Sequence, residues 1–280
     1  MTKESLLEVR GLQVAYGTPA APVPVVRDVS FTLGREKVAV VGESGSGKTT
    51  VGRALLKLLP HQARISAERL QFDGIDLLQA GERGMQALRG RRLSMIMQDP
   101  KYSLNPVMPI GRQIGEAVQR GGKLSRAECD ERVEALLARV RIREPKRVAA
   151  QYPHEVSGGM GQRVMIAMML AQRPQLLIAD EPTSALDVSV RQEVLGLLDE
   201  LVAEQGLALL FISHDLNLVK HFCDRVLVMY AGRIVEALAA ADLARARHPY
   251  TQGLMASLPS LRHRRAVLPV LRRDAAWSAA

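Results

Sequence analysis

A glycine-rich segment between a short apolar run and a helical run constrains this chain more than any other feature of its sequence. The apolar run is Lys37–Val41, the segment is GESGSGKTT at 42–50, and the helical run follows at Val51–Leu59. Glycines let successive backbone N–H groups converge on phosphate oxygens, because no Cβ blocks the approach. The pattern Gly-x4-Gly-Lys-Thr between a strand and a helix therefore predicts a nucleotide-binding P-loop.

The residue types of this segment have separate predicted tasks. Lys48 is expected to reach the β- and γ-phosphates of ATP, and Thr49 to bind Mg²⁺. The helix that follows points the positive end of its dipole at the anion. The residues of the segment predicted to bind ATP are Gly42, Glu43, Ser44, Gly45, Ser46, Gly47, Lys48, Thr49 and Thr50.

A pair of acidic residues follows an apolar strand late in the chain. Leu176–Ala179 leads directly into Asp180 and Glu181. A carboxylate at the carboxyl end of a strand beside the P-loop strand can hold the Mg²⁺ shell, and the next one can orient or deprotonate an attacking water. We therefore expect Asp180 to take part in binding ATP and Mg²⁺, and Glu181 to be catalytic.

A third motif places a serine and two glycines directly before a helix. The segment is VSGGMGQR at 156–163, with Ser157 at the expected helix start. Bare N–H groups at such a start form a second anion-binding site. A monomeric P-loop enzyme has no use for two such sites.

These three motifs follow one another along the chain in the order P-loop, Ser-Gly-Gly segment, acidic pair. Together they resemble the ATP-binding subunits of ABC transporters, and the resemblance covers nearly all of the chain. In that family two ATPase domains face each other head to tail, and each ATP lies between the P-loop of one domain and the Ser-Gly-Gly segment of the other. We call the Ser-Gly-Gly segment of this chain the signature segment; its residues are Ser157, Gly158, Gly159 and Met160. The resemblance implies that this segment acts on the ATP bound by the partner domain.

The resemblance also implies roles for residues that are weak signals alone. Tyr16 matches the aromatic residue that stacks on adenine, Gln98 matches the glutamine that touches Mg²⁺ and the water, and His214 matches the switch residue near the γ-phosphate. The Mg²⁺ ligands implied are then Thr49, Gln98 and Asp180. The loop that crosses the dimer interface in the family corresponds to Ser184, Ala185, Leu186 and Asp187.

The hydrophobic pattern predicts an α/β fold with N-terminal antiparallel strands, a mainly parallel sheet and an inserted helical part. Leu6–Val14 and the alternating Val29, Phe31 and Leu33 indicate strands, with a loop at Thr18–Pro24. Further strands are expected at Gln175–Ala179, Leu207–Ile212 and Val226–Met229, and helices at Met160–Ala171 and around Val190, Val194, Leu197, Leu198 and Leu201.

The domain organisation follows from this pattern. We expect an ATPase core formed by residues 1–105 and 157–245, and a helical subdomain at 106–156 with the signature motif at its end. Residues 246–280 are expected to form a C-terminal extension with a basic tail.

Composition excludes several classes of protein. Hydrophobic residues make up 47% and charged residues 24% of the 280 residues, which excludes a disordered, collagen-like or coiled-coil chain. The two cysteines, Cys129 and Cys223, lack the spacing of a disulfide framework or a zinc site. No cysteine follows Cys223, so the iron–sulfur cluster of some related subunits is not expected. No apolar run of 18 residues occurs, so we expect the pore to be a separate protein.

Finer features resemble the dipeptide/oligopeptide/nickel importer branch. They are the stretch Gln98–Pro106, Met160 where glutamine is commoner, and His248–Thr251 running to Leu258 and Pro259. The resemblance implies ATP-driven import of di- or oligopeptides, with nickel or a metal chelate as the alternative. It also implies a second ATPase subunit, identical or related, two membrane permeases and, indirectly, an extracytoplasmic solute-binding protein. The chain would then lie at the cytoplasmic face of the cell membrane, held by the permeases.

The net charge of +9 leaves one alternative of another class, a nucleic-acid-associated ABC ATPase. Such proteins separate the P-loop from the signature by long coiled coils, whereas about a hundred residues without persistent heptads intervene here. We therefore expect no nucleic-acid partner. Five arginines against one acid lie between Leu261 and Ala280, and deleting this tail after Pro259 should leave ATP hydrolysis intact. Lys101 and Tyr102 are expected either to contact a permease or to face water.

Overall fold

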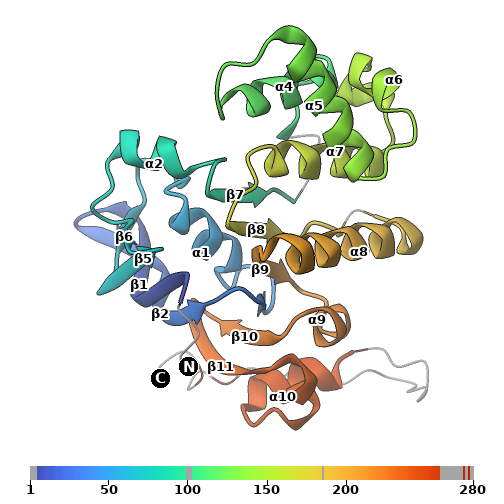
Figure 1. Ribbon diagram of the computed structural model, residues 1–280. Helices are drawn as coiled ribbons and strands as arrows, with labels where there is room; N and C mark the ends of the chain where they lie inside the picture. The colour runs from blue at the N-terminus through green and yellow to red at the C-terminus, as the bar shows by residue number, and fades with distance from the viewer. Residues whose placement is uncertain (1–4, 99–102, 185, 259–273, 275–276, 278–280) are drawn as a thin grey trace. The chain divides into compact units, whose positions relative to one another are not determined.

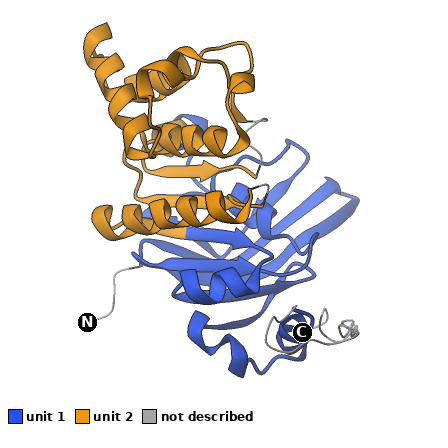
Figure 2. Ribbon diagram, turned by 90° about the vertical axis from the view of Figure 1, so that its right-hand side faces the viewer, with its two compact units in different colours: residues 1–85, 210–280 blue, residues 86–209 orange. Residues whose placement is uncertain are grey.

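The computed structural model of the chain describes residues 5–98, 103–184, 186–258, 274 and 277. The chain divides into two units, which Figure 2 colours separately. Unit 1 comprises residues 1–85 and 210–280, and unit 2 comprises residues 86–209. The domain boundaries expected from the sequence, after residues 105, 156 and 245, stay predictions.

Unit 1 begins with an antiparallel sheet, as the sequence predicted. Strands β1 (Leu7–Thr18) and β2 (Ala21–Leu33) form its main hairpin, and β5 (Arg69–Phe72) and β6 (Ile75–Asp76) continue it in the order β2-β1-β5-β6. The short β4 (Arg64–Ser66) also pairs with β1. Val29, Phe31 and Leu33 at the end of β2 are buried and the residues between them are exposed, which confirms the period of two predicted there.

The prediction of a loop at Thr18–Pro24 is wrong. Pairing of β1 with β2 continues through Ala15↔Pro24 and Gly17↔Pro22 to Thr18↔Ala21, so only residues 19–20 form the turn. Proline cannot donate to a sheet ladder, but it is tolerated on an edge strand. In this sheet β2 is an edge strand. The proline spacing therefore marks an edge strand and not a loop.

The P-loop strand lies at its predicted position. Strand β3 (Lys37–Val41) is parallel to β10 (Arg225–Tyr230), which pairs antiparallel with β11 (Arg233–Ala239). Four of the five residues of β3 are buried, as expected for a strand covered on both faces. Helix α1 (Lys48–Leu55) begins three residues before the predicted start, because Gly47 already forms its left-handed N-cap.

The other elements of unit 1 come mostly from the C-terminal part of the chain. Two elements cross the boundaries between the units: α2 (Glu82–Leu88) and β9 (Ala208–Ser213). The remaining ones are α9 (Leu216–Phe222), the 3-10 helix η2 (Ala240–Arg245) and α10 (Pro249–Ala256).

Unit 2 combines a parallel strand pair with helices. Strands β7 (Leu93–Ile96) and β8 (Leu176–Asp180) are parallel, and every residue of both is buried. Figure 1 shows α4, α5, α6 and α7 gathered into one helical group, in which α4 and α5 pack on each other and each also contacts α6 and α7. The helical elements are α4 (Ile110–Gln119), α5 (Arg126–Arg139), α6 (Pro145–Ala150), the 3-10 helix η1 (Pro153–Glu155), α7 (Gly158–Leu170) and α8 (Val188–Gln205).

The inserted helical part predicted from the hydrophobic pattern is confirmed by α4, α5 and α6. Ile110, Ile114 and Val118 follow one face of α4 and are at most 1% exposed. Apolar residues at this spacing bury one stripe of a helix against its neighbours. None of the helices in the described ranges is long and apolar enough to cross a membrane.

Candidate functional site

The conformation of the P-loop requires glycine at two positions. Gly42 has a φ of 153° and Gly47 a φ of 102°, values that side chains rarely allow. A Cβ at Gly42 would lie 2.1 Å from the carbonyl oxygen of Met229, and one at Gly47 would lie 3.0 Å from that of Val25. Backbone from β10 and β2 therefore packs directly against the loop.

Lys48 lies inside the curve of this loop. Its Nζ donates to the carbonyl oxygens of Gly42 (2.9 Å) and Glu43 (2.8 Å), and the residue is only 6% exposed. The ammonium group is thus fixed at the N-terminus of α1, where the helix dipole adds positive potential. This combination of a fixed cation and a helix N-terminus suits the binding of phosphate groups.

Two hydrogen bonds from distant segments hold the loop. The N–H of Gly232, in the turn between β10 and β11, donates to the carbonyl oxygen of Ser46 (3.0 Å). The N–H of Glu43 donates to the hydroxyl oxygen of Tyr250 in α10 (3.0 Å). Sequence reasoning used His248–Thr251 only as a mark of a family branch and missed this contact. A tyrosine inside that segment was the available signal, since a buried tyrosine usually has a partner for its hydroxyl.

Unit 1 also contains two of the residues expected around the nucleotide. Tyr16 is half-buried on β1, opposite Val23 of β2. His214 is exposed directly after β9. The next residue, Asp215, accepts a hydrogen bond from the N–H of Leu218 (3.0 Å) and so caps α9. His214 therefore lies at a fixed junction between a buried strand and a capped helix.

Unit 2 brings together two of the predicted catalytic residues. Gln98, two residues after the end of β7, donates from Nε2 to Oε2 of Glu181 (3.0 Å). Asp180, the last residue of β8, is 3% exposed, and Glu181 follows it at the strand end. The parallel pairing of β7 and β8 places both segments at the same edge, because parallel strands end together.

The backbone of Glu181 adopts an unusual conformation. Its φ is 45°, in the left-handed region that costs a non-glycine residue about 1–2 kcal/mol. The N–H and hydroxyl of Ser184 both donate to the Glu181 carbonyl oxygen, at 3.2 and 3.1 Å. These two bonds help to hold the turn in which the Glu181 side chain meets Gln98.

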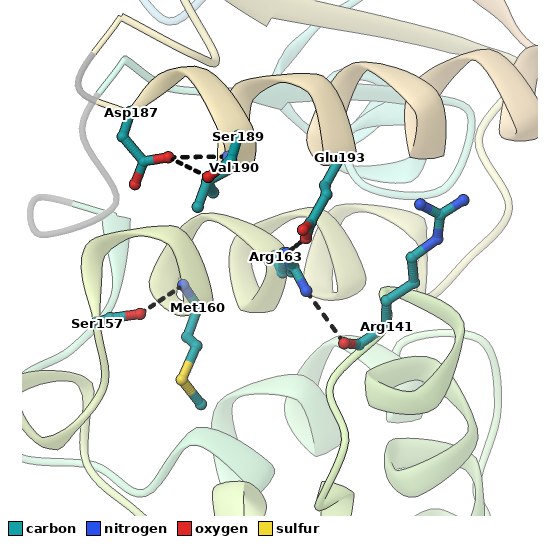
Figure 3. Close-up of polar contacts among 8 residues, drawn as sticks. All are labelled: Arg141, Ser157, Met160, Arg163, Asp187, Ser189, Val190 and Glu193. Atoms are coloured by element: carbon teal, nitrogen blue, oxygen red, sulfur yellow. Dashed lines mark hydrogen bonds and ion pairs between the residues drawn. The ribbon is translucent and has the colours of Figure 1, made fainter.

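The signature segment forms the start of α7 (Figure 3). The hydroxyl oxygen of Ser157 accepts a hydrogen bond from the N–H of Met160 (3.3 Å), which caps the helix. A Cβ at Gly159 would lie 2.6 Å from Cγ1 of Val190 in α8. Gly159 is therefore the residue that lets the first turns of α7 and α8 approach this closely.

The predicted interface loop leads into α8. Asp187 caps this helix by accepting from the N–H of Val190 (2.9 Å) and the hydroxyl of Ser189 (2.7 Å), as Figure 3 shows. The hydrogen bond from the Val190 N–H, with that from Ser189, lowers the pKa of the Asp187 carboxyl. Leu186 donates from its N–H to the carbonyl oxygen of Thr183 (3.3 Å). The capped loop is thus held close to the signature segment within unit 2.

A second contact joins α7 to α8 one turn further along. Arg163 forms an ion pair with Glu193 of α8 and donates from Nη1 to the carbonyl oxygen of Arg141 (3.1 Å), as Figure 3 shows. Burial, with the nearby charges of Arg141 and Arg143, lowers the pKa of the Arg163 guanidinium. The two helices are therefore fixed to each other at both their first and second turns.

Some predicted residues cannot be placed. Ala185 of the interface loop lies outside the described residues, as do Lys101 and Tyr102 and residues 259–273 of the basic tail.

The donor set expected for Mg²⁺ consists only of oxygen atoms: the Thr49 hydroxyl, the Gln98 carboxamide and the Asp180 carboxylate. Within the described residues, no group of three or more His, Cys, Asp or Glu side chains could hold a metal ion by itself. Mg²⁺ is usually bound through one or two carboxylates together with substrate phosphates and water. This donor set therefore fits an ion that binds together with a nucleotide.

Comparisons with known proteins agree with this chemistry. Residues 26–184 match the family described as ABC transporter. The chain is 48% identical over 263 residues to the probable peptide ABC transporter ATP-binding protein y4tR of Sinorhizobium fredii, covering 93% of this chain and 78% of that protein. It is 46% identical over 258 residues to the oligopeptide transport ATP-binding protein OppD of Salmonella typhimurium, covering 91% and 77%.

A solved structure has the same fold. The dimeric, ADP- and phosphate-bound ATP-binding cassette MJ0796 superposes with a TM-score of 0.75 at 24% identity, covering 84% of this chain and 98% of that one. This similarity confirms the α/β fold class predicted from the sequence.

Proposed function

This chain belongs to the ABC transporter family and is an ATPase of that family, and from this premise we propose that it drives the uptake of di- or oligopeptides across the cytoplasmic membrane. The proposal is supported by the sequence identity of this chain to two relatives. It is 48% identical, over 93% of its length, to a relative named for peptide transport, and 46% identical, over 91%, to one named for oligopeptide transport. The segment His248–Thr251 supports the same branch.

In the proposed reaction, residues of this chain bind the phosphates and activate water. Lys48 and the N–H groups of the P-loop neutralise the phosphate oxygens, and His214 stabilises the transferring group. Glu181 orients or deprotonates the attacking water, and Gln98 holds the Glu181 carboxylate through its 3.0 Å hydrogen bond. Positioned charges and donors of this kind account for most of the rate enhancement in phosphoryl transfer.

Thr49, Gln98 and Asp180 are the proposed ligands of Mg²⁺. When bound, Mg²⁺ neutralises charge on the β- and γ-phosphate oxygens. Asp180 is only 3% exposed. A buried carboxylate is stabilised by pairing with a cation, which supports a role of Asp180 as a Mg²⁺ ligand.

The remaining site residues are proposed to act on a second ATPase subunit, which is either an identical copy or a related chain. Ser157 and Gly158 are exposed at the start of α7, so their N–H groups are accessible to an anion from outside the chain. The loop from Ser184 to Asp187 would cross the same interface. Tyr16 would stack on the adenine of the ATP that the chain's own P-loop binds.

The proposed partners explain how hydrolysis would move a solute. ATP closes the pair of ATPase subunits, because only the closed state uses both the P-loop and the signature segment as anion sites. Hydrolysis removes the bridging γ-phosphate, and opening resets two membrane permeases that receive solute from an extracytoplasmic binding protein. The chain would lie at the cytoplasmic face of the membrane, attached to these permeases.

Solute uptake tests this proposal. Cells lacking the native subunit are complemented with the wild-type chain, with Glu181→Gln or with the control Glu204→Gln, which changes an exposed glutamate paired with Arg139. They are offered labelled di- and oligopeptides beside free and chelated nickel. We expect peptide uptake with the wild type and the control, and none with Glu181→Gln. Nickel uptake without peptide uptake, or no uptake of either, would contradict the peptide assignment.

A further inference from the structure

Tyr250 is a buried residue of α10 that contacts the P-loop directly. It is 0% exposed, and its hydroxyl oxygen accepts the hydrogen bond from the N–H of Glu43 at 3.0 Å. The two residues are 207 positions apart in the chain. Its backbone is also fixed, because Nδ1 of His248 accepts a hydrogen bond from the Tyr250 N–H at 3.1 Å and caps the helix.

Two aromatic rings contact that of Tyr250 and help to fix the orientation of its side chain. The ring of Tyr230 lies 4.6 Å from that of Tyr250, centroid to centroid, and the ring of Trp277 lies 6.0 Å away. Trp277 also packs edge-on against Tyr230 and His248. Aromatic contacts at these distances are favourable beyond the area that they bury. The ring cluster of Tyr230, His248, Tyr250 and Trp277 therefore holds the hydroxyl at one place beside the loop.

The hydrogen bond of Tyr250 acts on the same peptide unit that holds Lys48. The peptide between Gly42 and Glu43 accepts from Lys48 Nζ at its carbonyl oxygen (2.9 Å) and donates to Tyr250 at its N–H. Rotation of this peptide would move both groups together. Glycine leaves such a peptide with unusual rotational freedom, and Gly42 has no side chain that could restrict it. Tyr250 supplies a restriction from outside the loop.

We propose that Tyr250 is a positioning residue for ATP binding, which orients the Gly42–Glu43 peptide and, through it, the ammonium group that meets the nucleotide phosphates. This inference rests on the proposed role of the P-loop and Lys48 in ATP binding. It gives α10, which follows the α/β elements of unit 1 in the chain, a part in the nucleotide site. The hydroxyl acts through backbone and does not touch the substrate.

The test compares two tyrosine-to-phenylalanine variants of the full chain. Tyr250→Phe removes the acceptor and keeps the ring, whereas Tyr230→Phe removes a hydroxyl from the neighbouring ring of the same cluster. The affinity for a fluorescent ATP analogue and the KM and kcat for ATP are measured for both. One lost hydrogen bond predicts an affinity about 3- to 10-fold weaker and an equally raised KM for Tyr250→Phe. We expect kcat to stay within about twofold, because Lys48 itself and the residues that activate the water are unchanged in this variant.

Emission from Trp277, the single tryptophan of the chain, reports whether the ring cluster remains packed. We expect wild-type emission from Tyr250→Phe and wild-type ATP affinity from Tyr230→Phe. Unchanged ATP affinity in Tyr250→Phe would overturn the inference. Equal weakening in both variants, or shifted emission in Tyr250→Phe, would overturn it too, because a general loosening of the cluster would then be the cause. Failure of the wild type to bind the analogue would instead count against the proposed function.

Discussion

Cys223, at the end of α9, shows how burial sets the chemistry of a single side chain. The residue is 8% exposed, and burial raises the pKa of its thiol from 9.0 to about 12, while the charge of Lys37 partly opposes this. A raised pKa means that the unfolded state loses its proton first. The contribution of this thiol to stability is therefore fully present below pH 9 and is lost as the pH rises towards 12.

Urea unfolding at pH 8 and pH 10 measures this effect in the wild type and in Cys223→Ala. Between these pH values the wild type should lose about 1.4 kcal/mol more free energy of unfolding than the variant does, since each pKa unit is worth that amount. Other groups that titrate in this range cancel in the comparison. Equal losses in the two proteins would contradict the buried, neutral state of Cys223.

The sequence identified some site residues and not others, for physical reasons. The P-loop residues could be predicted because a local pattern of glycines, Lys48 and Thr49 determines their geometry within one turn. The hydrogen bond between Gln98 and Glu181 depends on the pairing of two strands and on the positive φ of Glu181, which no local pattern reveals. Tyr250 was missed because its contact joins segments 207 positions apart.

At the scale of elements, the first turns of α7 and α8 depend on one glycine. Gly159→Ala should lower the free energy of unfolding by about 1–3 kcal/mol, because the new Cβ would overpack against the stiff side chain of Val190. Gly158→Ala is the matched control, since a Cβ at Gly158 meets nothing within 4 Å. Chemical denaturation measures all variants.

The double variant Gly159→Ala with Val190→Ala should recover part of the loss, because it removes the contacted methyl groups. If Gly159→Ala were as stable as Gly158→Ala, the close approach of the two helices would be disproved.

Predicted elements agreed with the structure where the pattern was local, and failed where neighbouring strands decide. Strand β3 was placed correctly because its apolar run and its glycine boundary are unambiguous. The segment Ala21–Pro24 was assigned to a loop because proline usually interrupts strands, but a hairpin partner and an edge position override that preference. The sequence therefore predicted a strand reliably where the local pattern was unambiguous, and failed where pairing with a neighbouring strand determines the structure.

At the scale of the whole molecule, the order of motifs along the chain indicated both the family and the fold class. Motif order is informative because each motif needs its own strand or helix. The order of the motifs therefore indicates the order of these strands and helices along the chain. The transported solute is less accessible to such reasoning, because in the proposed importer the permeases and the binding protein contact it. The basic residues between Leu261 and Ala280 add positive charge to the end of the chain, and truncation after Pro259 tests whether ATP hydrolysis depends on them.

Hydrolysis and binding of ATP by Glu181→Gln test the central claim most directly. Wild type, Glu181→Gln and the control Glu204→Gln are assayed at concentrations that allow two copies to associate, or with a related partner subunit co-expressed. Loss of a general base predicts turnover reduced by about 10²- to 10⁴-fold, with ATP affinity within about twofold of the wild type. Near-normal hydrolysis by Glu181→Gln, with the control unaffected, would contradict the account.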